Sequence, residues 1–122
     1  LDEAWDAASS FFDDVRLAPG GYAHFMVALD FAFGPSREVV VAGDKDEPGT
    51  LALLHALESR FLPHSVVILR PDGEECPPIC RIAPFTEKMK SIEGRATAYV
   101  CSGNACRPPT TDTGTMMGWM ED

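Results

Sequence analysis

The hydrophobic period of the chain changes near residue 37, and this change limits the folds open to it. The β-branched runs "REVVVAGD" and "SVVILR" are separated by the helical pattern "TLALLHALESRFL". A strand, a helix and a strand in this order predict a βαβ unit with parallel strands and a right-handed crossover. "ATAYVC" adds a third strand, so we expect an α/β fold whose small three-stranded sheet is mainly parallel.

The first part of the chain has helical spacing instead. Apolar residues and acids alternate from Leu1 to Val15, "LAPGG" interrupts the pattern, and a second apolar helix runs to Gly34. These features predict an αα-hairpin over residues 1–36, packed on an α/β module of residues 37–122. Because the helical pattern is already under way at Leu1, we expect the chain to be part of a longer protein. Residues 71–95 carry no clear pattern. Asp112 precedes a weak helical pattern in residues 113–122 and could cap such a helix, which Gly114 and Gly118 would weaken.

The composition excludes several classes of function. Of 122 residues, 45% are hydrophobic and 24% are charged, which is typical of a globular domain. The net charge is −9 and the basic residues are scattered, so no nucleic-acid partner is expected. No apolar run approaches the roughly 18 residues of a membrane span. We therefore expect a cytoplasmic protein with no membrane partner and no cofactor.

Four cysteines offer three interpretations. Nothing indicates secretion, so the thiols of Cys76, Cys80, Cys101 and Cys106 are expected to be reduced. In the first interpretation, Cys101 is a buried strand residue and Cys106 packs beneath the following loop. In the second, Cys101 and Cys106 form a redox pair, although four residues separate them where two are usual. In the third, all four bind zinc, with spacings at the edge of the usual pattern.

Polar residues near the predicted strand ends form a candidate pocket. Asp44 follows the first strand at its carboxyl end, where open α/β sheets bind ligands. The acids beside it disfavour a phosphate, so a cap of the turn is the favoured role. No catalytic residue is assigned, because His24, His55 and His64 are isolated in the sequence. The candidate pocket residues are Asp44, Asn104, Thr111 and Asp112.

Several blocks of the sequence resemble a known family. They are "ALDFAFGPSREVVVAGD", "LLHALESRFLPHSVVILRP", "IAPF" and "GRATAYVCSGNACRPPTTD". Together they are similar to the C-terminal end of the YyaL-type, spermatogenesis-associated thioredoxin-domain proteins. The last block is the most specific, and its matching residues are Tyr99, Val100, Cys101, Asn104, Cys106, Pro109, Thr111 and Asp112. Cys76 and Cys80 are outside the family pattern, and the tail lacks the acidic, leucine-rich helix usual there.

The resemblance implies a long parent protein. Its members have a thioredoxin-like domain, a helical toroid similar to six-hairpin glycosidases, and an α/β end piece. Residues 1–36 would be the last hairpin of that toroid, and the remainder of the toroid would be their partner. The implied function is a non-catalytic accessory module, within a parent whose chemistry involves thiols or carbohydrates. The isolated piece would expose an apolar patch through which it forms a homodimer.

Overall fold

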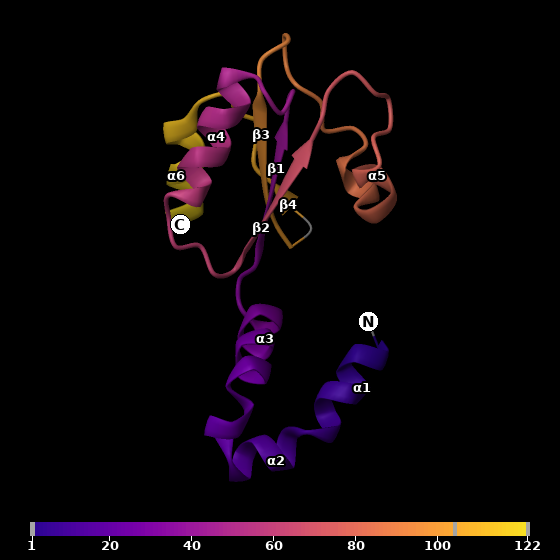
Figure 1. Cartoon of the computed structure of the whole chain (residues 1–122), viewed down its shortest axis with the longest axis vertical. Helices are drawn as coiled ribbons and strands as arrows, with labels where there is room; N and C mark the ends of the chain where they lie inside the picture. The colour runs from indigo at the N-terminus through magenta and orange to yellow at the C-terminus, as the bar shows by residue number, and fades with distance from the viewer. Residues whose placement is uncertain (1, 104, 122) are drawn as a thin grey trace. The chain divides into compact units, whose positions relative to one another are not determined.

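The computed structural model describes residues 2–103 and 105–121, and it divides into two compact units (Figure 1). The first ends at Gly34 and the second begins at Pro35, and each is described by itself. None of the described helices has the length and apolar character required to cross a membrane.

The first unit contains the expected helical hairpin, but its first helix is divided. α1 (Asp2–Ser10) ends before Phe11, and α2 (Phe12–Leu17) begins directly after it. A 3₁₀ turn, η1 (Pro19–Tyr22), then leads into α3 (Ala23–Phe33). Pro19 starts this turn because its fixed φ suits a first helical position.

Aromatic side chains join the helices of the first unit. The rings of Trp5 and Phe33 lie 5.0 Å apart between centroids, and Phe11 contacts both Tyr22 and Phe25. Val15 is nevertheless the only buried residue among the described residues of α1, α2 and α3. The unit therefore holds its apolar side chains together without enclosing them.

The second unit is built on a mixed four-stranded sheet with the order β2-β1-β3-β4. β1 lies in the middle and pairs with β2 in parallel and with β3 in antiparallel orientation. The crossover helix α4 connects β1 and β2, which confirms the predicted βαβ unit. The strands and this helix are β1 (Arg37–Ala42), α4 (Pro48–Glu58), β2 (Ser65–Arg70), β3 (Thr97–Ser102) and β4 (Ala105–Cys106).

The prediction of a three-stranded, mainly parallel sheet is wrong, although the α/β class is confirmed. β3 runs antiparallel to β1, and β4 adds a short fourth strand. The reason lies in residues 71–96, which leave the end of β2 and return to the same end of the sheet. A strand that starts where its predecessor stopped must run in the opposite direction, because no crossover intervenes.

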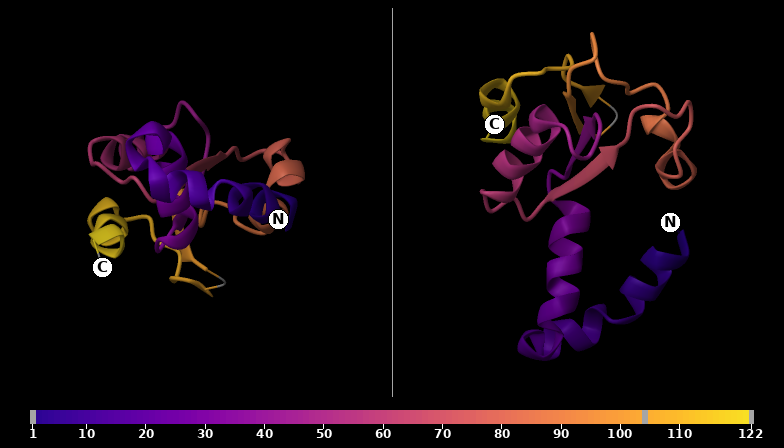
Figure 2. Two further views of the ribbon diagram at one scale, coloured as in Figure 1. Left: turned by 90° about the horizontal axis from the view of Figure 1, so that it is seen from below. Right: turned by 45° about the horizontal axis from the view of Figure 1, so that its top comes forward.

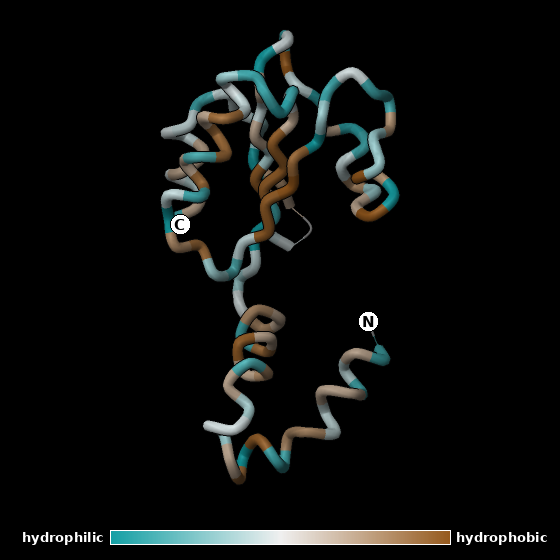
Figure 3. Tube along the Cα trace, in the orientation of Figure 1, coloured by the Kyte–Doolittle hydropathy of each residue, from teal (hydrophilic) through white to brown (hydrophobic). Residues whose placement is uncertain are grey.

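The core lies between one face of the sheet and two helices. α4 and a last helix, α6 (Thr113–Glu121), cover the same face (Figures 1 and 2). Hydrophobic residues, drawn in brown, follow the strands through the centre of this unit (Figure 3). The buried core cluster comprises Val39, Val41, Leu53, Leu57, Ala96, Ala98, Val100, Met116 and Met120.

The two parallel strands differ in burial, although both consist largely of a continuous apolar run. Val39, Val40 and Val41 are fully buried, since β1 has a neighbour on each side. β2 is an edge strand, and its Val66 and Val67 are 41% and 42% exposed. A continuous apolar run does not distinguish a central strand from an edge strand.

Arg70 organises the segment that follows β2. Its side chain is only 1% exposed, and its guanidinium donates to the carbonyl oxygens of Thr86, Glu87 and Glu75. Asp72 lies 3.8 Å from the same guanidinium. This segment holds only the short helices α5 (Ile79–Ile82) and η2 (Pro84–Thr86), so one side chain supplies hydrogen bonds that regular structure would otherwise provide.

Candidate functional site

A tight hairpin between β3 and β4 places Cys101 opposite Cys106. Gly103, in the two-residue connection, has φ = +60°, a left-handed conformation that glycine adopts without steric cost. The backbone N–H of Arg107 donates to the carbonyl of Val100, which closes the ladder beside the two cysteines. Their Cα atoms are 3.9 Å apart and their sulfurs are joined in a disulfide.

The expectation of four reduced thiols is therefore wrong for this pair. In a hairpin with a two-residue loop, residues five apart in sequence face each other, and Cys101 and Cys106 have this separation. The dipeptide Gly-Asn at positions 103 and 104 is a hairpin signal that could have revealed the pairing. Asn104 itself lies outside the described residues.

The other two cysteines are reduced and are neighbours. Cys80 is buried and receives a hydrogen bond from the hydroxyl of Thr86, whereas Cys76 is exposed. The hydrogen bond with Cys80, and then desolvation, raise the pKa of the Cys76 thiol. Residues 2–103 and 105–121 contain no group of three or more His, Cys, Asp or Glu side chains able to hold a metal. With Cys101 and Cys106 already joined, the structure lends no support to the four-thiolate zinc interpretation.

Asp44, Thr111 and Asp112, the candidate pocket residues that the structure describes, do not line the hollows beside the disulfide. Asp44 is exposed in the turn after β1, where its carbonyl accepts from the backbone N–H of Glu47. Thr111 and Asp112 lie between the bridge at Thr110 and the start of α6. These residues are at the end of the sheet opposite the β3–β4 hairpin, because Ala98 pairs with both Thr110 and Val41.

Asp112 is the N-cap of α6. Its Oδ2 accepts hydrogen bonds from the backbone N–H and the hydroxyl of Thr115, at 2.6 and 2.7 Å. These two bonds, the hydroxyl contributing more, lower the pKa of the Asp112 carboxyl. The residue therefore has a structural role that its position before a weak helical pattern already suggested.

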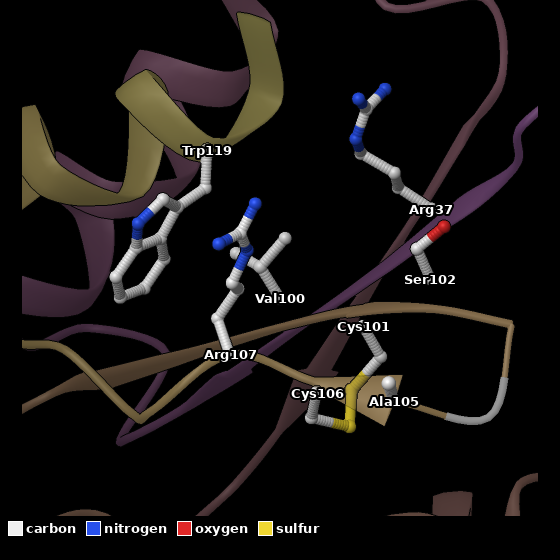
Figure 4. Close-up of a pocket in the computed structure, with 8 residues that line it drawn as sticks. All are labelled: Arg37, Val100, Cys101, Ser102, Ala105, Cys106, Arg107 and Trp119. Atoms are coloured by element: carbon white, nitrogen blue, oxygen red, sulfur yellow. A yellow bond between two sulfur atoms is a disulfide. The ribbon is translucent and has the colours of Figure 1, made fainter. Parts of the chain in front are cut away.

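A pocket of about 410 Å³ lies on the helix-covered face of the sheet, beside the disulfide (Figure 4). Arg37 and Ser102 border one side, and the side chain of Arg107 rises beside the indole of Trp119 on the other (Figure 4). Val100 lies between them. The remaining lining residues are Cys101, Ala105 and Cys106.

Sequence reasoning did not select Arg37, Arg107 or Trp119, since they lie on three different elements. Arg37 begins β1 and pairs with Ser102 of β3, while Arg107 follows β4 and Trp119 belongs to α6. None of the three stands in a local motif. Only the sheet register and the docking of α6 bring them to one pocket.

A second hollow, of about 370 Å³, lies on the opposite face of the hairpin. It is lined by Glu38, Phe85 and Met89 together with the two cysteines of the disulfide. Cys101 is buried and Cys106 is exposed. The disulfide is thus bordered by a hollow on each face of the sheet.

The sequence of the chain is similar to those of known mammalian proteins. Spermatogenesis-associated protein 20 of Homo sapiens is 30% identical over 112 residues, which is 92% of the chain and 14% of that protein. The chain is thus similar in sequence to a segment of spermatogenesis-associated protein 20. The proteins of the same description from Rattus norvegicus and Mus musculus are 30% and 29% identical over the same length. The resemblance expected from the sequence is confirmed, and the chain spans about one seventh of these relatives, from the 14% coverage.

No family model matches the chain, and no solved structure matches it.

Proposed function

We propose that this chain is a non-catalytic accessory module of a longer protein, in which its helical unit completes a larger helical domain. The observation that carries this proposal is the exposed apolar surface of α1 and α3. A groove of about 530 Å³ runs between them and is lined by apolar side chains alone: Ala4, Trp5, Ala8, Phe25, Ala28, Leu29, Phe31 and Ala32.

Two arguments support further helices of the same protein as the partner that covers this groove. A hairpin that buries only Val15 among its described helical residues gains little from the hydrophobic effect, at about 25 cal/mol per Å² of buried apolar surface. Further helices of the same protein would bury this groove. The relatives are several times longer than the chain, so they have the length to supply such helices. The same proposal places this chain at the C-terminal end of its parent protein, which would also contain a helical toroid and a thioredoxin-like domain.

The proposal is tested by one substitution in two contexts. Ala28→Asp changes an exposed side chain of the groove, so in the isolated chain it should lower thermal stability only slightly. In the full-length parent protein, the same carboxylate would be buried without a partner, and we expect a loss of about 3 kcal/mol or more. Thermal or denaturant unfolding of each protein measures the difference.

Ala7→Asp is the matched control. Ala7 is also exposed in the hairpin, but Glu3 and Ser10 precede and follow it on the same helix face. Ala7→Asp should therefore leave the stability of the isolated chain and of the full-length parent unchanged. Equal effects of Ala28→Asp in the isolated chain and in the full-length parent would show that the groove stays uncovered, and would contradict the accessory role.

A second candidate function is favoured by the disulfide: reversible thiol exchange at Cys101 and Cys106. A dithiol reductant would attack the disulfide at Cys106, the exposed residue of the pair, forming a mixed disulfide and releasing the Cys101 thiol. The second thiol of the reductant would then release the Cys106 thiol, so the reductant becomes a disulfide and the pair gains two electrons and two protons. Mass spectrometry after alkylation in graded dithiol redox buffers would measure this exchange under native conditions. Reduction only after denaturation would assign the disulfide a purely structural role.

A further inference from the structure

The pocket of Figure 4 combines positive charge with an aromatic wall, and nothing in the proposed accessory role requires it. The chain has 19 acidic and 10 basic side chains, so its average surface is negative. The described residues that line this pocket include the arginines Arg37 and Arg107 and no acid. A positive pocket on an acidic protein attracts negative ions in preference to other ligands.

Backbone pairing holds these groups in place. Arg37 is directly opposite Ser102 in the β1–β3 ladder, and Arg107 is anchored through its N–H to Val100. The hydroxyl of Ser102 donates to the carbonyl of Ser36, which fixes the strand next to Arg37. The disulfide ties β4, and therefore the chain entering Arg107, to β3.

Trp119 provides the third element of the pocket. α6 is fixed by the burial of Met116 and Met120 in the core and by the Asp112 cap. Trp119, between these methionines along the helix, presents its indole to the pocket (Figure 4). The indole thus offers a flat apolar surface beside the guanidinium of Arg107 and across the pocket from that of Arg37 (Figure 4).

We propose that this pocket binds a small organic oxyanion, a carboxylate or phosphate that carries a flat apolar group. The oxyanion would accept hydrogen bonds from the guanidinium groups of Arg37 and Arg107, whose planar geometry suits carboxylates and phosphates. The flat group would lie against the indole of Trp119. The volume of about 410 Å³ is within the range of small-molecule sites.

The test uses phenyl phosphate and benzoate as probes on the complete 122-residue chain, with isothermal titration calorimetry as the measurement. Both probes should bind saturably and more weakly as salt is added, because the interaction is electrostatic. Benzamide, which is flat but neutral, should not bind. Inorganic phosphate should bind more weakly than phenyl phosphate, since it lacks the group that contacts Trp119.

Substitutions assign the binding to this pocket. Arg37→Gln and Arg107→Gln should each weaken phenyl phosphate binding about tenfold or more, the loss expected for a charge-assisted hydrogen bond. Trp119→Leu should weaken phenyl phosphate but leave inorganic phosphate unchanged. Arg95→Gln is the matched control, because Arg95 is an exposed arginine that precedes β3, at the far end of the strand from Ser102.

Circular dichroism and the retained disulfide would establish that each variant is folded. Arg37→Lys keeps the positive charge with little change in volume and should recover part of the affinity. The proposal is overturned if neither probe binds in the millimolar range, or if Arg37→Gln and Arg95→Gln bind equally well. Because no step of this test involves the parent protein, its result is independent of the accessory role.

Discussion

Asp112 connects a single ionisable group to the docking of α6. As the N-cap of this helix, it accepts two hydrogen bonds from Thr115, and they favour the carboxylate over the protonated acid. The pKa of Asp112 in the folded chain is accordingly below its ordinary value of 3.8. The folded chain thus binds this proton more weakly than the unfolded chain does.

The sign of the pH dependence follows from this shift. The stability that the cap contributes is fully present above the ordinary carboxyl pKa and is lost as the pH falls through the lowered folded value. We expect Asp112→Ala to destabilise the chain at pH 7, with a smaller difference from the wild type at pH 2. Urea unfolding at both pH values measures it, and an equal difference at both would contradict the prediction.

The roles of some single residues could be predicted from the sequence, and those of others could not. Asp112 could be identified as a cap from its position, since capping depends on neighbours within one helical turn. The Cys101–Cys106 pair was interpreted as two thiols, although its spacing and the intervening Gly103 matched a tight hairpin. Arg37 and Arg107 could not be linked at all, because 69 intervening positions, residues 38–106, separate them and a sheet register joins them.

At the scale of elements, Arg70 replaces secondary structure in the segment after β2. Arg70→Met would remove the donors to the carbonyls of Thr86, Glu87 and Glu75 in a buried site. Because unsatisfied buried groups are costly, we expect the free energy of unfolding to fall by about 3 kcal/mol. Denaturant unfolding followed by circular dichroism measures the change.

Arg60→Met provides the comparison for Arg70. The Arg60 side chain is 60% exposed and forms an ion pair with Glu121 at 3.1 Å, and such surface pairs contribute about 0–1 kcal/mol. This variant should be close to the wild type. Similar stability of the two variants would show that Arg70 does not hold the segment together.

The elements themselves were predictable in part. The βαβ unit follows from β-branched runs on either side of a helical period, which are local properties of the chain. The direction of β3 was not predictable, because it depends on where residues 71–96 bring the chain back to the sheet. That path is set by Arg70 and its carbonyl partners, which no periodicity reveals.

On the scale of the whole molecule, the two units differ in how much they bury. The α/β unit encloses a core around Val39, Leu53 and Met116, whereas the described helices of the first unit bury Val15 alone. In the isolated chain we expect amides of α1 and α3 to exchange with deuterium much faster than those of β1. Hydrogen exchange resolved by residue measures this, and equal protection of the two units would contradict it.

Residues close to each other in sequence determined the α/β class, the helical hairpin, the βαβ unit and the family resemblance. Each depends on hydrophobic period, turn residues or short motifs, which act over a few positions. The antiparallel course of β3, the disulfide, the buried Arg70 and the pocket of Arg37, Arg107 and Trp119 were decided by the tertiary structure. They require segments far apart in the chain to meet, and that meeting depends on strand register and the packing of side chains in the core.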